Sequence, residues 1–155
     1  MFNIQGVVLK GLGQIDQCIE AYYKALAIKP DYADAYNNIG NALKQQGKLK
    51  EAIEAYKKAL GIKSDYAEAY SNMGNALKEQ GKLNEAIEAF NNALTIKPDN
   101  ADAYCKIGSA LQEQGKLDEA IESYEKATAI KPDNAEVYYN MGLLLQEQKG
   151  RMALP

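Results

Sequence analysis

The side chains that most often carry out chemistry in proteins are scarce in this sequence. Its 155 residues include no histidine and a single arginine, Arg151. Histidine is the commonest general base and metal ligand, and it is the usual partner of a serine or cysteine nucleophile. Acidic residues also outnumber basic ones by 21 to 18, which disfavours a surface that binds nucleic-acid phosphates. We therefore expect no enzymatic activity, no metal, no cofactor and no nucleic-acid partner.

The remaining reactive groups are better explained as structural. Gly11-Leu12-Gly13 lacks the Gly-Lys-Ser/Thr of a phosphate loop and indicates a turn. Cys18 stands where later segments have alanine, which predicts close packing, whereas Cys105 lies on a polar helix face, which predicts a partly exposed but non-catalytic thiol. Glutamate pairs spaced by three recur and are typical of a solvated helix face: Glu51/Glu54, Glu85/Glu88 and Glu119/Glu122.

A stripe of asparagines is the feature that most favours a binding function. Residues 33–46 place Asp34, Asn37, Asn38, Asn41, Lys44 and Gln45 three and four apart, on one face of a helix. Asparagine is a poor helix former, yet its amide can pair with both the C=O and the N–H of an extended peptide. The predicted peptide-binding residues are Asn37, Asn38, Asn41, Asn72, Asn75, Lys106, Tyr139 and Asn140.

These residues are positioned by a repeat of 34 residues. The string Ala-Asp/Glu-Ala-Tyr begins at Ala33, Ala67 and Ala101, and Ala-Glu-Val-Tyr begins at Ala135. Apolar spacing of three and four predicts a first helix over 33–46 and a second over 49–62, separated by Gly47. In the Pro-Asp between units, Asp99 and Asp133 are expected at the start of the next helix.

The repeat also defines the organisation of the chain as a single array over residues 1–148. It consists of a partial unit 1–32, full units 33–66, 67–100 and 101–134, a partial unit 135–148 and a tail 149–155. The first helix is expected to be weak, because Gly6, Gly11 and Gly13 lower helix propensity.

The pattern Tyr36-x2-Ile39-Gly40-x2-Leu43, then Ala52-x3-Tyr56, then Ala59 resembles the tetratricopeptide repeat (TPR). The resemblance implies an all-α fold, a right-handed α-solenoid of helix-turn-helix pairs. First helices (A) would line a concave groove and second helices (B) would form the convex face. It also implies a scaffold that binds a protein or an extended peptide in the groove.

Two narrower resemblances bear on the ligand. The asparagines are similar to the ladder in the repeats of O-linked N-acetylglucosamine transferases, and the units resemble bacterial arrays that precede glycosyl- or sulfotransferase domains. This leaves open that the chain is a substrate-recognition fragment of a larger transferase. The carboxylate clamp of co-chaperones would correspond to Asn37, Asn41, Asn72, Asp102 and Lys106. Two of its lysines are missing, and Asp102 would repel the carboxylates of an acidic partner.

The ends of the sequence suggest a third alternative, a self-assembling array. Both ends resemble interrupted units, and Tyr138, Met141, Leu144 and Leu145 would normally pack against a further B helix. We expect some of this surface to stay exposed and the chain to form a homo-oligomer through its terminal helices. Residues 1–66 carry a net charge of +2 and residues 67–155 carry a net charge of −5.

Apolar runs are too short for membrane insertion, and a cytoplasmic location is expected.

Overall fold

The chain folds as a series of α-helices, which a computed structural model describes for residues 14–154. Within those residues there is no strand, as the repeat predicts. The expected weak first helix and Gly11-Leu12-Gly13 lie outside the described residues. The helices are α2 (Ile15–Ile28), α3 (Ala33–Gln45), α4 (Leu49–Ile62), α5 (Ala67–Glu79), α6 (Leu83–Ile96), α7 (Ala101–Glu113), α8 (Leu117–Ile130) and α9 (Ala135–Met152).

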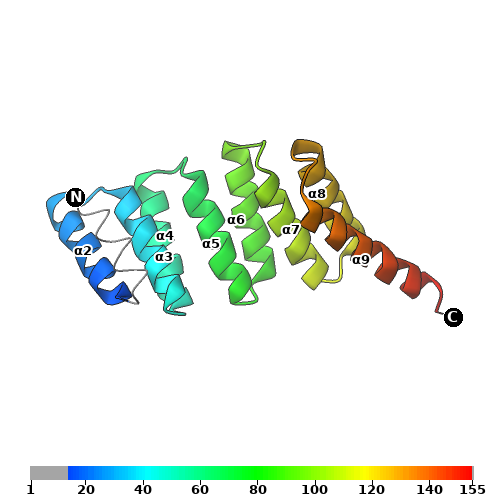
Figure 1. The fold of residues 1–155 in the computed structure, drawn as a ribbon. Helices are drawn as coiled ribbons and strands as arrows, with labels where there is room; N and C mark the ends of the chain where they lie inside the picture. Colours follow the sequence, from blue (N-terminus) through cyan, green and yellow to red (C-terminus); the bar gives the residue numbers. More distant parts are fainter. Residues whose placement is uncertain (1–13, 155) are drawn as a thin grey trace.

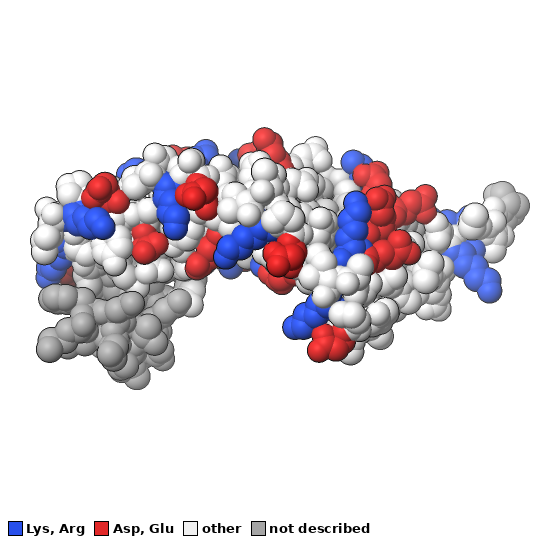
Figure 2. All heavy atoms as spheres, turned by 90° about the horizontal axis from the view of Figure 1, so that it is seen from above, with Lys and Arg blue, Asp and Glu red and all other residues white. Residues whose placement is uncertain are grey.

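The helices pair and stack as a right-handed α-solenoid, which confirms the predicted fold class. The A helices are α3, α5, α7 and α9, and the B helices are α2, α4, α6 and α8. Each full unit packs its two helices against each other, and each B helix also contacts the next A helix. Because α3 also contacts α5, we assign the A helices to the inner side of the curve. Figure 2 shows the described residues as an elongated array.

Close approach within each unit depends on a glycine of the A helix. Gly40, Gly74 and Gly108 face the rings of Tyr56, Phe90 and Tyr124 from the paired B helix. A Cβ atom on Gly74 would lie only 2.6 Å from Cε1 of Phe90, closer than carbon atoms pack. The rings are fully buried, so these glycines set the distance between the two helices.

A second glycine ends each A helix of the full units. Gly47, Gly81 and Gly115 have φ angles of 74°, 77° and 74°, which side chains other than glycine seldom adopt. The equivalent position in the last unit is Lys149. There the chain does not turn, and α9 continues to Met152, four residues beyond the expected end at Gln148.

The caps at the helix starts differ from the expectation for Asp99 and Asp133. The side chains of Asn100 and Asn134 cap α7 and α9, because they accept hydrogen bonds from the backbone N–H groups of Ala103 (3.1 Å) and Val137 (3.3 Å). A capping side chain must lie on the residue just before the helix in order to reach these groups. Each aspartate lies one residue too early.

The outer face of α9 is only partly as predicted. Tyr138 and Leu145 are 51% and 50% exposed, but Leu144 is fully buried, so it is not part of the exposed surface. Leu144 is equivalent to Ala42, Ala76 and Ala110, which are all buried. This position belongs to the core in every unit, whether or not another helix follows. Among the described residues, no helix is long and apolar enough to cross a membrane.

Candidate functional site

A chain of amide and carboxylate contacts joins α3 to α5. Asn37 lies between the two helices and is only 1% exposed. Its Oδ1 accepts a hydrogen bond from Nδ2 of Asn72 at 3.1 Å, and its Nδ2 donates to Oε1 of Glu68 at 3.4 Å. The sequence placed Asn37 on an exposed stripe, and the structure corrects this. Because the array curves, α5 approaches α3 closely enough to cover this position.

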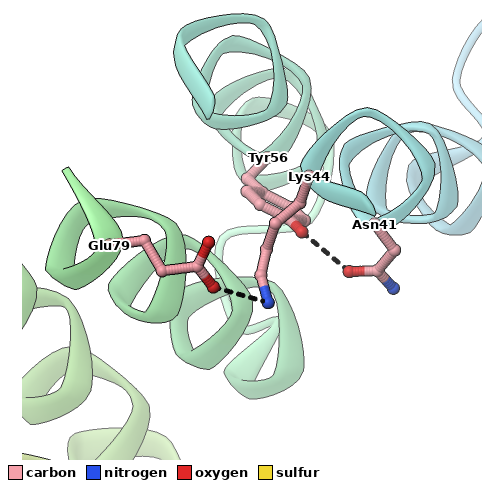
Figure 3. A network of polar contacts seen from close by, with 4 residues as sticks. All are labelled: Asn41, Lys44, Tyr56 and Glu79. Atoms are coloured by element: carbon pink, nitrogen blue, oxygen red, sulfur yellow. Dashed lines mark hydrogen bonds and ion pairs between the residues drawn. The ribbon is translucent and has the colours of Figure 1, made fainter. Parts of the chain in front are cut away.

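A second set of contacts holds the other end of these helices (Figure 3). The Tyr56 hydroxyl of α4 donates a 2.7 Å hydrogen bond to Oδ1 of Asn41, and Nζ of Lys44 lies 3.1 Å from Oε1 of Glu79 on α5. Burial, together with the Glu79 carboxylate, raises the pKa of Tyr56 above its ordinary value. The phenol therefore stays protonated at neutral pH and remains the donor. Asn41 thus has a structural partner within its own unit.

The lysine–glutamate contact recurs one unit later, where Nζ of Lys78 lies 3.0 Å from Oε1 of Glu113. In the following unit the equivalent of Lys44 is Gln112, and its Oε1 accepts a 3.4 Å hydrogen bond from the Tyr124 hydroxyl. Burial is the main cause that raises the pKa of Tyr124 to about 12. Contacts between neighbouring A helices thus stiffen the surface on which the other asparagines lie.

The asparagines that remain available to a ligand are Asn38, Asn75 and Asn140. All three are half-buried, and none makes a side-chain hydrogen bond to another described residue. Tyr139 is 68% exposed. Of the eight predicted residues, the structure therefore leaves these four unengaged, whereas Asn37, Asn41 and Asn72 already have partners. Lys106 is also engaged, because its Nζ lies 2.7 Å from Oδ2 of Asp102 and 6.0 Å from the Phe90 ring centroid.

The surface of the A helices has an excess of negative charge. These helices, including α9 up to Met152, carry five basic residues: Lys44, Lys78, Lys106, Lys149 and Arg151. They carry seven carboxylates: Asp34, Glu68, Glu79, Asp102, Glu113, Glu136 and Glu147. Lys44, Lys78, Lys106 and Arg151 each pair with one of these carboxylates, which leaves Asp34, Glu68 and Glu136 without an ion pair among the described residues. A ligand on this side therefore meets unpaired carboxylates and free amides.

Two open clefts lie between B helices. The first, of about 470 Å³, lies between α2 and α4 with Tyr36 and Leu43 of α3 among its lining residues. The second, of about 420 Å³, lies between α4 and α6 with Met73 and Leu77 of α5. Both recur at the repeat period and are lined by lysines and glutamates together, so neither selects a ligand by charge. They follow from the spacing of the B helices.

The other reactive groups lie where the sequence placed them. Cys18 is buried and Cys105 is half-buried. The six glutamates that are spaced by three along α4, α6 and α8 are exposed. The part of the chain that the structure describes has no cluster of three or more metal-ligating side chains. Toward the C-terminal end, Figure 2 shows carboxylates gathered on the surface.

We expect Cys105 to react slowly with thiol reagents at neutral pH. Burial raises the pKa of its thiol, and the carboxylates of Asp102 and Glu136 raise it further. A higher pKa leaves less thiolate at pH 8, so the reaction with a disulfide reagent should be slower than that of free cysteine and should accelerate as the pH rises. Replacing Asp102→Asn should speed the reaction at pH 8. A rate equal to that of free cysteine would contradict this prediction.

A family model described as a TPR repeat matches the sequence four times, over residues 6–47, 40–81, 74–115 and 108–149. The structure is similar to the crystal structure of MamA, with a TM-score of 0.85 and 32% identity, over 93% of this chain and 84% of that chain. No curated protein sequence matches.

Two further solved structures share the fold. YrrB, described as a TPR protein with an unusual peptide-binding site, has a TM-score of 0.76 at 24% identity, over 94% of this chain and 75% of that one. The first TPR domain of Spaghetti (RPAP3), solved with the HSP90 peptide SRMEEVD, has a TM-score of 0.72 at 26% identity, over 76% of this chain and 93% of that one.

Proposed function

Because this chain belongs to the TPR repeat family, we propose that it is a protein-interaction scaffold that binds an extended peptide along the inner surface of its A helices. The observation that carries the proposal is a set of amides that make no hydrogen bond to another described residue, those of Asn38, Asn75 and Asn140, on a surface stiffened by contacts between helices. A half-buried amide loses less freedom than a fully exposed one when it pairs with a peptide backbone.

The charge of this surface favours a peptide that carries lysine or arginine. The carboxylates without an ion pair, Asp34, Glu68 and Glu136, attract cationic side chains, while Lys44, Lys78 and Lys106 are each paired with a carboxylate already. The domain of RPAP3 was solved with a peptide that ends in Glu-Glu-Val-Asp. In this chain, Asp102 and Glu136 would repel such a sequence, so we propose that acidic C-terminal peptides are not its ligands.

The binding test replaces two of the free amides together, Asn38→Ala with Asn75→Ala. Each peptide hydrogen bond contributes about 1 kcal/mol, so losing two should weaken binding of a Lys/Arg-containing peptide about 30-fold. The affinity of the parent chain should be micromolar or weaker, and it should fall with added salt. Titration calorimetry with peptides taken from a peptide-array screen measures both quantities.

The matched control removes two exposed asparagines from the B helix α6, Asn91→Ala with Asn92→Ala. This variant should bind like the parent chain. If the Asn38/Asn75 variant binds the peptide with the affinity of the parent chain, these amides do not contribute to binding. Stronger binding of an acidic peptide than of a basic one would refute the charge preference.

Three further expectations belong to this proposal. We expect no catalysis, so any turnover that persists through repurification and disappears on mutation of one residue of this chain would contradict it. A role as a substrate-recognition fragment of a transferase stays a prediction, and a catalytic domain in the same polypeptide would support it. A cytoplasmic location also stays a prediction from the sequence.

A further inference from the structure

One side of α9 presents a row of apolar side chains that no described helix covers. Tyr138, Leu145 and Met152 are seven residues apart and are 51%, 50% and 82% exposed. Side chains at this spacing point to the same side of a helix and form a continuous seam. Gly142 and Lys149 follow Tyr138 and Leu145 by four residues and border the same row. We call these five residues the open face of α9.

In the other units, the equivalent face is covered by a helix. Tyr36, Gly40 and Leu43 of α3 correspond to Tyr138, Gly142 and Leu145, and α4 packs against α3 with the Tyr56 ring on Gly40. Nothing lies within 4 Å of the position of a Cβ atom on Gly142. The open face is therefore shaped to receive a helix.

A neighbouring side of α9, about 100° around the helix axis from the open face, is held in the array. Val137 and Leu144 are buried, and Nε2 of Gln148 donates a hydrogen bond to Oδ1 of Asp118 on α8. These contacts fix the rotation of α9 about its axis, so the open face points away from the other described helices. In Figure 1, the second half of α9 extends beyond α8.

We propose that the open face of α9 binds the same face of a second copy of this chain, in an antiparallel helix pair with two-fold symmetry. An axis that crosses α9 between residues 143 and 144 places Gly142 opposite Leu145 of the partner subunit, and Tyr138 opposite Lys149 of the partner subunit. A large side chain then fills the space above a glycine, and an ammonium group lies over an aromatic ring. The face is complementary to itself in both size and charge.

The departure of the last unit from the repeat supports this pairing. Because Lys149 replaces the glycine that ends the other A helices, α9 has 18 residues where α3, α5 and α7 have 13. The additional turn adds Lys149 and Met152 to the open face and lengthens α9 from about 20 to about 27 Å. A two-fold pair uses the same face on both copies and closes at two, so it produces a dimer and not a filament.

The test is sedimentation equilibrium of the whole chain over a range of concentrations, with the variant Leu145→Glu. The parent chain should show a reversible monomer–dimer equilibrium. The variant places two charges in the seam of each dimer, so its dissociation constant should rise at least 100-fold. The control Ile28→Glu removes an apolar side chain that is 87% exposed on α2, far along the chain from α9, and should leave the equilibrium unchanged.

A second variant, Gly142→Ala, separates the pairing from folding. It adds only a methyl group on open helix surface, so the monomer should fold, as judged by circular dichroism and thermal unfolding. The methyl group should nevertheless obstruct Leu145 of the partner subunit and weaken the dimer at least 10-fold. The proposal is overturned if the parent chain stays monomeric at millimolar concentration, if its mass rises beyond that of a dimer, or if both α9 variants associate as the parent does.

Discussion

Replacing Gly74 with alanine should destabilise the protein by about 2 kcal/mol, although alanine is the better helix former. The new Cβ atom would lie 2.6 Å from Cε1 and 2.8 Å from Cδ1 of Phe90. That ring is fully buried, so it can move only by displacing other core side chains, and overpacking of this kind costs about 1–3 kcal/mol or more. The gain in helix propensity of about 1 kcal/mol offsets only part of the cost. Urea denaturation followed by circular dichroism measures the change.

Gly142→Ala is the matched control for this substitution. It makes the same chemical change at the equivalent position of α9, where nothing lies within 4 Å. Only the gain in helix propensity from glycine to alanine remains, so the variant should be as stable as the parent or more stable by up to about 1 kcal/mol. Both variants should be compared at low concentration, so that association does not contribute to stability.

A double variant tests the cause of the Gly74→Ala effect. Phe90→Leu removes the ring atoms that the new methyl group would meet, at the cost of a poorer core. If the collision with the ring is responsible, Gly74→Ala should cost much less in the Phe90→Leu background than in the parent. Additive effects of the two substitutions would show that the loss has another origin.

The helices and the turns between them were predictable because the repeat supplies several copies of the same information. The B helix predicted over 49–62 is observed with those limits, and the break at Gly47 is observed with the positive φ that glycine permits. Equivalent positions in four units separate the positions that must be small or aromatic from those that vary. A single unit would not have distinguished the packing glycine Gly40 from the turn glycine Gly47.

The candidate site was less predictable, because it depends on contacts between units. The spacing of one helix places Asn37 among polar neighbours, and only the approach of α5 shows that Asn37 is buried against Asn72 and Glu68. The pairing of Asn41 with Tyr56 likewise depends on the rotation of one helix relative to the other. The sequence contains each side chain, but the curvature of the array decides which amides remain available.

Two adjacent leucines of α9 should respond very differently to the same substitution. Leu144 is fully buried in the core, whereas Leu145 is half-exposed. Leu144→Ala should cost about 2–5 kcal/mol, because it removes buried apolar area and leaves a cavity. Leu145→Ala should cost about 1 kcal/mol or less in the monomer, since water already contacts half of that side chain.

The Leu144 substitution should also show which part of the array α9 stabilises. In a repeat protein each unit contacts mainly its neighbours, so loosening α9 should affect α8 first and the helices near α2 least. Hydrogen exchange of the Leu144→Ala variant should therefore show faster exchange in α8 and α9 than in α4. Equal costs for the two leucine substitutions would mean that α9 does not pack as described, and the open face on which the dimer depends would then be assigned to the wrong side of the helix.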